Sequence, residues 1–136
     1  MNDRELMFLP AHEQKRLIVD KVISSVEMVE ASYRRIAELE PQLNAFITLD
    51  EDGAMSAARS ADAQLAQGKN PGVLHGVPIA VKDLEVTKGL RTTLGSTFFK
   101  NWIPDYDSVG VQRIRCLLYT SPSPRDRTRS RMPSSA

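Results

Sequence analysis

Apolar residues recur at helical spacing through the first third of the chain, with short polar breaks between the runs. Residues 13–22 present one short apolar stripe. A second stripe follows a capping-box pattern, in which Ser24 and Glu27 can each satisfy a backbone N–H at the helix start. Pro41 disfavours helical backbone at the residue before it. The pattern therefore predicts a helix over residues 25–39, whose apolar face is formed by Val26, Val29, Tyr33 and Ile36.

Two further runs favour extended backbone. Residues 44–49 are rich in strand-forming side chains, and residues 77–81 form an almost wholly apolar run, typical of a strand buried on both faces in an α/β protein. Pro78 places the start of the second strand at or next to itself. Between the runs, acidic residues 50–52 mark the start of an alanine-rich helix that we expect to end at Gly68. These elements predict an α/β fold.

Irregular structure is expected after the second strand. Residues 87–89 predict a turn, residues 91–96 an extended segment or loop, and residues 108–115 the first turns of a helix. Within residues 91–96, four small or polar side chains either line a site or only shape a turn: Thr92, Thr93, Gly95 and Ser96.

The chain changes character at Cys116. Residues 116–136 are dominated by serine, proline and arginine, and four arginines against Asp126 give them a net charge of +3. The rest of the chain then has 14 basic and 16 acidic residues, or −2. Little apolar surface follows Tyr119 to offset the entropy lost on ordering. We therefore divide the chain into residues 1–115 and a disordered tail, residues 116–136.

Composition narrows the class of protein. The formal net charge of +1 provides no strong field for nucleic acid or membranes, and no apolar run reaches the length of a membrane span. The charged N-terminus lacks the apolar core of a secretory signal. Cys116 is the single cysteine, and the two histidines lie far apart with no cysteine nearby. We expect a cytoplasmic enzyme with no metal, cofactor, membrane or nucleic-acid partner, and the oligomeric state is left open.

Residues 72–83, Gly-Val-Leu-His-Gly-Val-Pro-Ile-Ala-Val-Lys-Asp, carry the most specific motif and resemble the amidase signature family. Further segments match the family in order and spacing: residues 24–30, 33–36, 43–46, 88–96 and 106–109. Several segments in register make a strong signal. The resemblance covers about the first 115 residues. It implies the N-terminal part of the amidase signature fold, a mixed sheet covered by helices, which is incomplete here.

The resemblance implies that Lys82 is the lysine of a Ser–Ser–Lys triad that cleaves a carboxamide. In that mechanism a neutral lysine draws a proton, through a bridging serine, from the nucleophilic serine. Burial in apolar surroundings would favour the neutral form, and a rigid strand end would aim the side chain. Taken alone, a lysine at a strand end is usually a solvated charge. The family pattern therefore carries the catalytic assignment.

The two serines of the triad are not assigned. In the family they lie in a glycine- and serine-rich segment further along, which has no counterpart here, and Ser134 and Ser135 lack the surrounding glycines. His75 is expected to pack or bond locally, and Asp83 to pair with a base, orient a loop or remain a surface carboxylate.

We expect an amidase acting on a small-molecule amide. This chain alone would be inactive, and its incomplete sheet would expose apolar surface and favour aggregation.

Other functions stay open. The same family includes the glutamine-hydrolysing subunit of a tRNA-dependent amidotransferase, and the residues that would distinguish it lie mostly beyond Arg115. A non-catalytic binding module, or nucleic-acid binding through the arginine-rich tail, is a further alternative. The run from Cys116 to Asp126, however, looks like the translation of a transposon-end adaptor used in sequencing libraries. We therefore hypothesise that the reading frame leaves the gene near Arg115.

Overall fold

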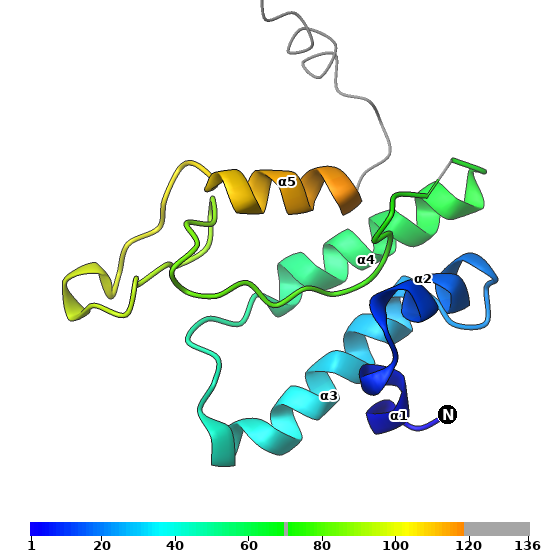
Figure 1. Cartoon of the computed structure of the whole chain (residues 1–136), viewed down its shortest axis with the longest axis horizontal. Helices are drawn as coiled ribbons and strands as arrows, with labels where there is room; N and C mark the ends of the chain where they lie inside the picture. The colour runs from blue at the N-terminus through cyan, green and yellow to red at the C-terminus, as the bar shows by residue number, and fades with distance from the viewer. Residues whose placement is uncertain (70, 119–136) are drawn as a thin grey trace, which may run out of the picture.

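The computed structural model describes residues 1–69 and 71–118, which form helices joined by irregular segments (Figure 1). The helices are α1 (Asp3–Phe8), α2 (Ala11–Val19), α3 (Ser25–Leu43), α4 (Glu51–Ala66) and α5 (Val109–Leu118), with a 3₁₀ helix, η1 (Thr97–Phe99). Within these residues no strand is formed, and no helix is long and apolar enough to cross a membrane. The helical part of the expected α/β fold is therefore present, whereas its mixed sheet is not observed.

Helix α3 is the centre of the packing. It contacts both α4 and α1, and Figure 1 shows α3 and α4 side by side. The buried core joins residues from α1, α2 and α3 with one residue of the lysine motif: Leu6, Ile18, Met28, Ala31 and Val77. Because Val77 is only 7% exposed, the motif is attached to the helical core at the first residue of the apolar run that leads to Lys82.

The start of α3 follows the sequence pattern. The Ser24 hydroxyl accepts from the Glu27 N–H at 3.0 Å, and the Ser24 N–H donates to the Glu27 carboxylate at 2.7 Å. Hydrogen bonds from the Ser24 N–H, then from its hydroxyl, lower the pKa of Glu27. The predicted capping box is therefore confirmed.

Helix α4 ends just before Gly68, as expected. This glycine adopts a left-handed conformation with φ +70°, which is common just after a helix. The Gly68 N–H donates to the Leu65 carbonyl, and the Lys69 N–H donates to the Gln64 carbonyl.

The predicted end of α3 is wrong. The helix runs through Pro41 to Leu43 and ends at Asn44, which adopts a left-handed conformation with φ 49°. Proline lacks an N–H, so one helical hydrogen bond is lost. The turn still closes because the Asn44 N–H donates to the Glu40 carbonyl at 2.8 Å. Closure of this last turn, which local backbone preference did not predict, extends the helix.

Neither predicted strand forms. Residues 44–49 and 77–81 lie in irregular segments, and their side chains Ile47, Leu49, Ile79 and Val81 are 38–48% exposed. A strand is stable only when its backbone groups pair with a neighbouring strand, and the described part of the chain provides no such ladder. The expected exposed apolar surface is therefore present at these two segments, and aggregation remains a prediction.

The predicted boundary after Arg115 falls inside a helix, because α5 continues through Cys116 to Leu118. Residues 119–136, which make up the rest of the predicted tail, lie outside the described residues. The division at residue 115 and the adaptor origin of the tail remain hypotheses.

Asp62 of α4 provides a second cap for α3. Its carboxylate accepts from the Ser25 N–H at 2.7 Å and from the Val26 N–H at 3.2 Å. These are donors of the first helical turn, which the helix itself cannot satisfy. Positive partial charge at a helix N-terminus also favours a carboxylate. Asp62 therefore joins α3 to α4 through a polar contact as well as through apolar packing.

We expect Asp62→Ala to lower the free energy of unfolding by about 1–3 kcal/mol, because two backbone donors lose a charged acceptor. Asp105→Ala, at an exposed carboxylate, is the matched control for loss of one negative charge and should change stability by less than about 0.5 kcal/mol. Urea denaturation followed by circular dichroism measures both. Equal effects of the two substitutions would rule out a special role for Asp62.

Candidate active site around Lys82

The segment before Lys82 is anchored in the helical core. His75 is 2% exposed, and its Nε2 lies 3.0 Å from the Ala61 carbonyl oxygen on α4, within hydrogen-bond distance. Two residues later, Val77 enters the core. The expectation that His75 packs and bonds locally is confirmed. Its role is to hold the motif against α4.

Gly76 crosses the N-terminal end of α3 at very short range. Its φ of +74° lies in the left-handed region, which favours glycine. A Cβ placed there would lie 2.3 Å from Ser25 Oγ and 3.1 Å from a methyl carbon of Ile18. Ser25 itself is fully buried. The glycine is therefore required by both the backbone conformation and the close approach of α3.

Lys82 lies at the end of the apolar run, and its side chain is exposed. Its carbonyl oxygen accepts a hydrogen bond from the Glu85 N–H at 2.8 Å, which closes a turn directly after the lysine. The described residues provide no buried apolar surroundings for the Lys82 ammonium. The structure therefore holds the Lys82 backbone in a turn but does not build the apolar environment that the catalytic role implies.

Asp83 organises the loop that follows. Its carboxylate accepts from the Thr93 N–H at 2.8 Å, from the Thr93 hydroxyl and from the Gly95 N–H at 3.2 Å. Desolvation alone would raise the pKa of Asp83, but these hydrogen bonds, with the nearby Arg91 charge, outweigh it and lower the pKa. Of the roles considered for Asp83, the structure shows the loop-orienting one.

The lowered pKa of Asp83 predicts a dependence of loop stability on pH. The pKa of Asp83 in the folded chain lies below the value of about 3.9 expected for an unfolded aspartate. The ionised carboxylate therefore contributes its full stabilisation at pH values above about 3.9. Its contribution is lost as the pH falls through the lower folded pKa. We expect local opening at the Thr93 and Gly95 amides to increase over this acidic range once their exchange is corrected for the intrinsic pH effect. Asp83→Asn should remove this dependence, as measured by hydrogen exchange.

The loop beyond Lys82 is tied to the start of α5. The Glu85 carboxylate accepts from the Ser108 hydroxyl at 2.5 Å, and the Val86 carbonyl accepts from the Ser108 N–H at 2.7 Å. Asp107 accepts from the Lys88 N–H at 2.7 Å and pairs with Arg115 at 2.9 Å. The turn expected at residues 87–89 is present and has φ +78° at Gly89.

The four candidate residues of 91–96 shape this loop. Thr92 and Thr93 are 2% and 7% exposed, and the Thr92 N–H donates to the Trp102 carbonyl at 3.0 Å. Gly95 binds Asp83, and the Ser96 hydroxyl accepts from the Phe98 N–H at 3.2 Å at the start of η1. Their contacts within the described residues are those of turn formation.

Sequence reasoning missed Arg91. Its guanidinium donates to the Ile47 carbonyl and, at 3.3 Å, to the Lys100 carbonyl, while the Thr48 hydroxyl donates to the Arg91 carbonyl at 3.0 Å. Arg91 therefore holds the segment that precedes α4 against the segment that follows Lys82. No local pattern marks such a contact, because its partners are distant backbone carbonyls.

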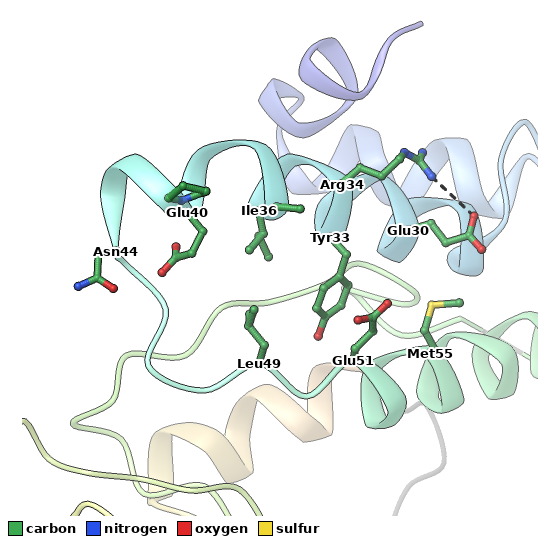
Figure 2. Close-up of a pocket in the computed structure, with 11 residues that line it drawn as sticks. Glu30, Tyr33, Arg34, Ile36, Glu40, Asn44, Leu49, Glu51 and Met55 are labelled. Atoms are coloured by element: carbon green, nitrogen blue, oxygen red, sulfur yellow. Dashed lines mark ion pairs between the residues drawn. The ribbon is translucent and has the colours of Figure 1, made fainter.

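A groove of about 860 Å³ lies elsewhere, between α3 and the start of α4 (Figure 2). Figure 2 shows Tyr33 and Ile36 of α3 facing Leu49 and Met55, with the Arg34–Glu30 ion pair at the edge. None of the residues that line it belongs to the segment from Gly72 to Ser96. The groove is therefore separate from the Lys82 segment.

No cluster of three or more potential metal ligands occurs among the described residues.

A sequence model described as Amidase matches residues 27–117, a range that includes most of α3, all of α4 and the Lys82 motif. The chain belongs to the amidase family. The resemblance inferred from the motif is thus confirmed at the level of the family, over a range that begins close to the start of α3.

Individual relatives agree with this assignment. The chain is similar to proteins named as a subunit of glutamyl-tRNA(Gln) amidotransferase from Acidothermus cellulolyticus, Cutibacterium acnes and Carboxydothermus hydrogenoformans, with 43%, 45% and 40% identity. Each match covers 82% of this chain and 22–23% of the relative. The chain therefore spans less than a quarter of the length of these relatives.

Solved structures are similar as well. Two structures described as a vestigial protein complex that reveals the evolutionary origins of an s-triazine catabolic enzyme, one of them with an inhibitor bound, match with a TM-score of 0.71 and 25% identity. The match covers 86% of this chain and 24% of theirs. The arrangement of helices and loops in Figure 1 therefore recurs inside a larger protein.

Proposed function

We propose that this chain is the N-terminal portion of an enzyme that hydrolyses the C–N bond of a carboxamide, with Lys82 as the lysine of a Ser–Ser–Lys triad. The observation that carries the proposal is the family match across residues 27–117, which includes the motif around Lys82. The structure supports it because the backbone on both sides of Lys82 is held: Val77 lies in the core and Asp83 binds the following loop.

The proposed chemistry requires a mobile proton. The neutral Lys82 amine takes a proton from a bridging serine, and the bridging serine takes a proton from the nucleophilic serine. The oxygen of the nucleophilic serine then bonds to the amide carbon. The proton held by the lysine passes back through the bridging serine to the departing nitrogen as the C–N bond breaks, and water then hydrolyses the acyl group from the serine. In the complete enzyme, we propose that the family's mixed sheet covers the exposed run at residues 79–81 and provides the apolar surroundings that favour a neutral amine.

A second candidate function is the glutamine-hydrolysing subunit of a tRNA-dependent amidotransferase. The relatives that are named for such an amidotransferase, at 40–45% identity, favour it specifically. In that case the substrate is the side-chain carboxamide of glutamine, and the ammonia released is used by partner subunits. A small-molecule amide is the substrate in both cases, and a cytoplasmic location remains a prediction.

The first experiment is long-read sequencing of the source DNA across the codon for Arg115, followed by expression of the uninterrupted frame. We expect a glycine- and serine-rich segment with two serines downstream, and ammonia release from a carboxamide. Glutamine hydrolysis that rises on addition of amidotransferase partner subunits would favour the second candidate, whereas efficient hydrolysis of simple amides alone would favour the first. A frame that ends with the present tail would contradict hydrolysis by this gene product.

A further inference from the structure

Asp83 and the loop opposite it form a closed local unit directly after Lys82. Besides the three hydrogen bonds to its carboxylate, the Asp83 carbonyl accepts from the Leu94 N–H at 3.2 Å. Both the side chain and the backbone of Asp83 are therefore held by residues 93–95. Hydrogen bonds to an ionised carboxylate are stronger than those between neutral groups, which strengthens the contact between Asp83 and this loop.

The loop that holds Asp83 has an unfavourable backbone conformation. Leu94 adopts φ +52° and Gly95 adopts φ +67°. Glycine takes this conformation readily, but a leucine does so only against the steric resistance of its Cβ. The N–H groups on either side of Leu94, those of Thr93 and Gly95, donate to the Asp83 carboxylate, while the Leu94 N–H donates to the Asp83 carbonyl. Hydrogen bonds to an ionised acceptor are the stronger kind, so Asp83 offsets the strain at Leu94.

Hydrogen bonds also hold the backbone on the C-terminal side of Lys82. The Lys82 carbonyl accepts from the Glu85 N–H at 2.8 Å, and Glu85 is fixed to α5 through the Ser108 hydroxyl at 2.5 Å. Among the described residues, the ammonium of Lys82 forms no ion pair with Asp83 or with any other carboxylate. The exposed side chain is therefore directed by its backbone, which Asp83 and Glu85 hold on its C-terminal side.

We propose that Asp83 is the positioning residue of Lys82: its carboxylate holds the strained loop at Thr93–Gly95, and this contact fixes the backbone from which the lysine reaches the reacting serines. The inference rests on the proposed amidase function. It assigns Asp83 a task that does not require contact with substrate or an ion pair with the lysine. A misplacement of about 1 Å at a catalytic group can lower the rate roughly a hundredfold.

Hydrogen exchange on the present chain tests the coupling without any activity measurement. In Asp83→Asn we expect exchange to rise at least about tenfold at the direct partners, Thr93 and Gly95, and also at the Glu85 amide that binds the Lys82 carbonyl. Thr93→Val removes the hydroxyl that donates to Asp83 and accepts from the Gly95 N–H at 3.3 Å, but it keeps the Asp83 carboxylate. This variant should show the same increases in exchange at smaller amplitude. Unchanged protection of the Glu85 amide in both variants would overturn the proposal.

Kinetics of the uninterrupted enzyme test the consequence. Per titrated active site, Asp83→Asn should lower kcat about 10- to 100-fold with KM changed less than about threefold. Leu94→Gly added to Asp83→Asn should recover part of the loss, because glycine adopts this φ without strain. If Asp83 were needed only for folding, the variant would contain fewer active sites, but kcat per active site would be unchanged. That result would overturn the positioning role of Asp83. Retained activity in Lys82→Met would instead overturn the proposed function itself.

Discussion

Replacing Lys82 with methionine in the uninterrupted enzyme is expected to lower kcat for amide hydrolysis by about 10⁴-fold or more. Methionine keeps an unbranched side chain but provides no base, so neither serine can lose its proton at a useful rate. Arginine should fail similarly, because a guanidinium stays charged at neutral pH and cannot accept the proton. Single-turnover measurements with a carboxamide substrate separate loss of the chemical step from loss of binding.

Lys88→Met is the matched control for the Lys82 substitution. Lys88 is also exposed and lies in the same loop, where its backbone N–H, not its side chain, donates to Asp107 at 2.7 Å. We expect kcat to change less than about threefold in this variant. Equal losses in the two variants would show that activity depends on the charge of the segment, and the catalytic assignment of Lys82 would fail.

Gly76→Ala should be the most destabilising small substitution in the motif, with a loss of about 2–4 kcal/mol in the free energy of unfolding. About 1–2 kcal/mol of that comes from placing a side chain at φ +74°. Overpacking contributes the rest, since the new Cβ would lie 2.3 Å from the buried Ser25 hydroxyl oxygen. Urea denaturation of the purified chain measures the loss.

Gly89→Ala separates the two contributions. Gly89 has nearly the same backbone conformation, φ +78°, but open space around it, so only the conformational part of about 1–2 kcal/mol should appear. Combining Gly76→Ala with Ser25→Gly should relieve part of the overpacking and give a favourable coupling energy. If the Gly76 and Gly89 variants were equally stable, close approach of the motif to α3 would have no energetic weight.

Contacts between near neighbours in the chain were predicted well. The capping box at Ser24 and Glu27 and the glycine that ends α4 depend on residues within one helical turn, so their side-chain types suffice to predict them. The motif of residues 72–83 also predicted the family, because residue types at fixed spacing carry that information without a structure. The catalytic assignment of Lys82 depends on the same motif and remains a proposal.

Contacts between distant segments were not predictable from local patterns. Asp62 caps α3 from α4, and Arg91 binds carbonyls on two separate segments, although nothing in their own neighbourhoods distinguishes them from surface charges. The predicted strands failed for the related reason that strand pairing is a property of two segments, and apolar composition describes only one.

Residue types and their short spacing were therefore sufficient to predict the main helices, the cap of α3 and the family. The folded arrangement was needed to establish that Pro41 lies within a helix, that Gly76 closely approaches Ser25, and that Asp83 holds the loop at residues 93–95. Gly76 meets Ser25 because the motif packs on the helical core, and Asp83 meets residues 93–95 because the loop after Lys82 folds back on itself. The backbone around Lys82 is held by long-range hydrogen bonds and burial, which local propensity does not encode.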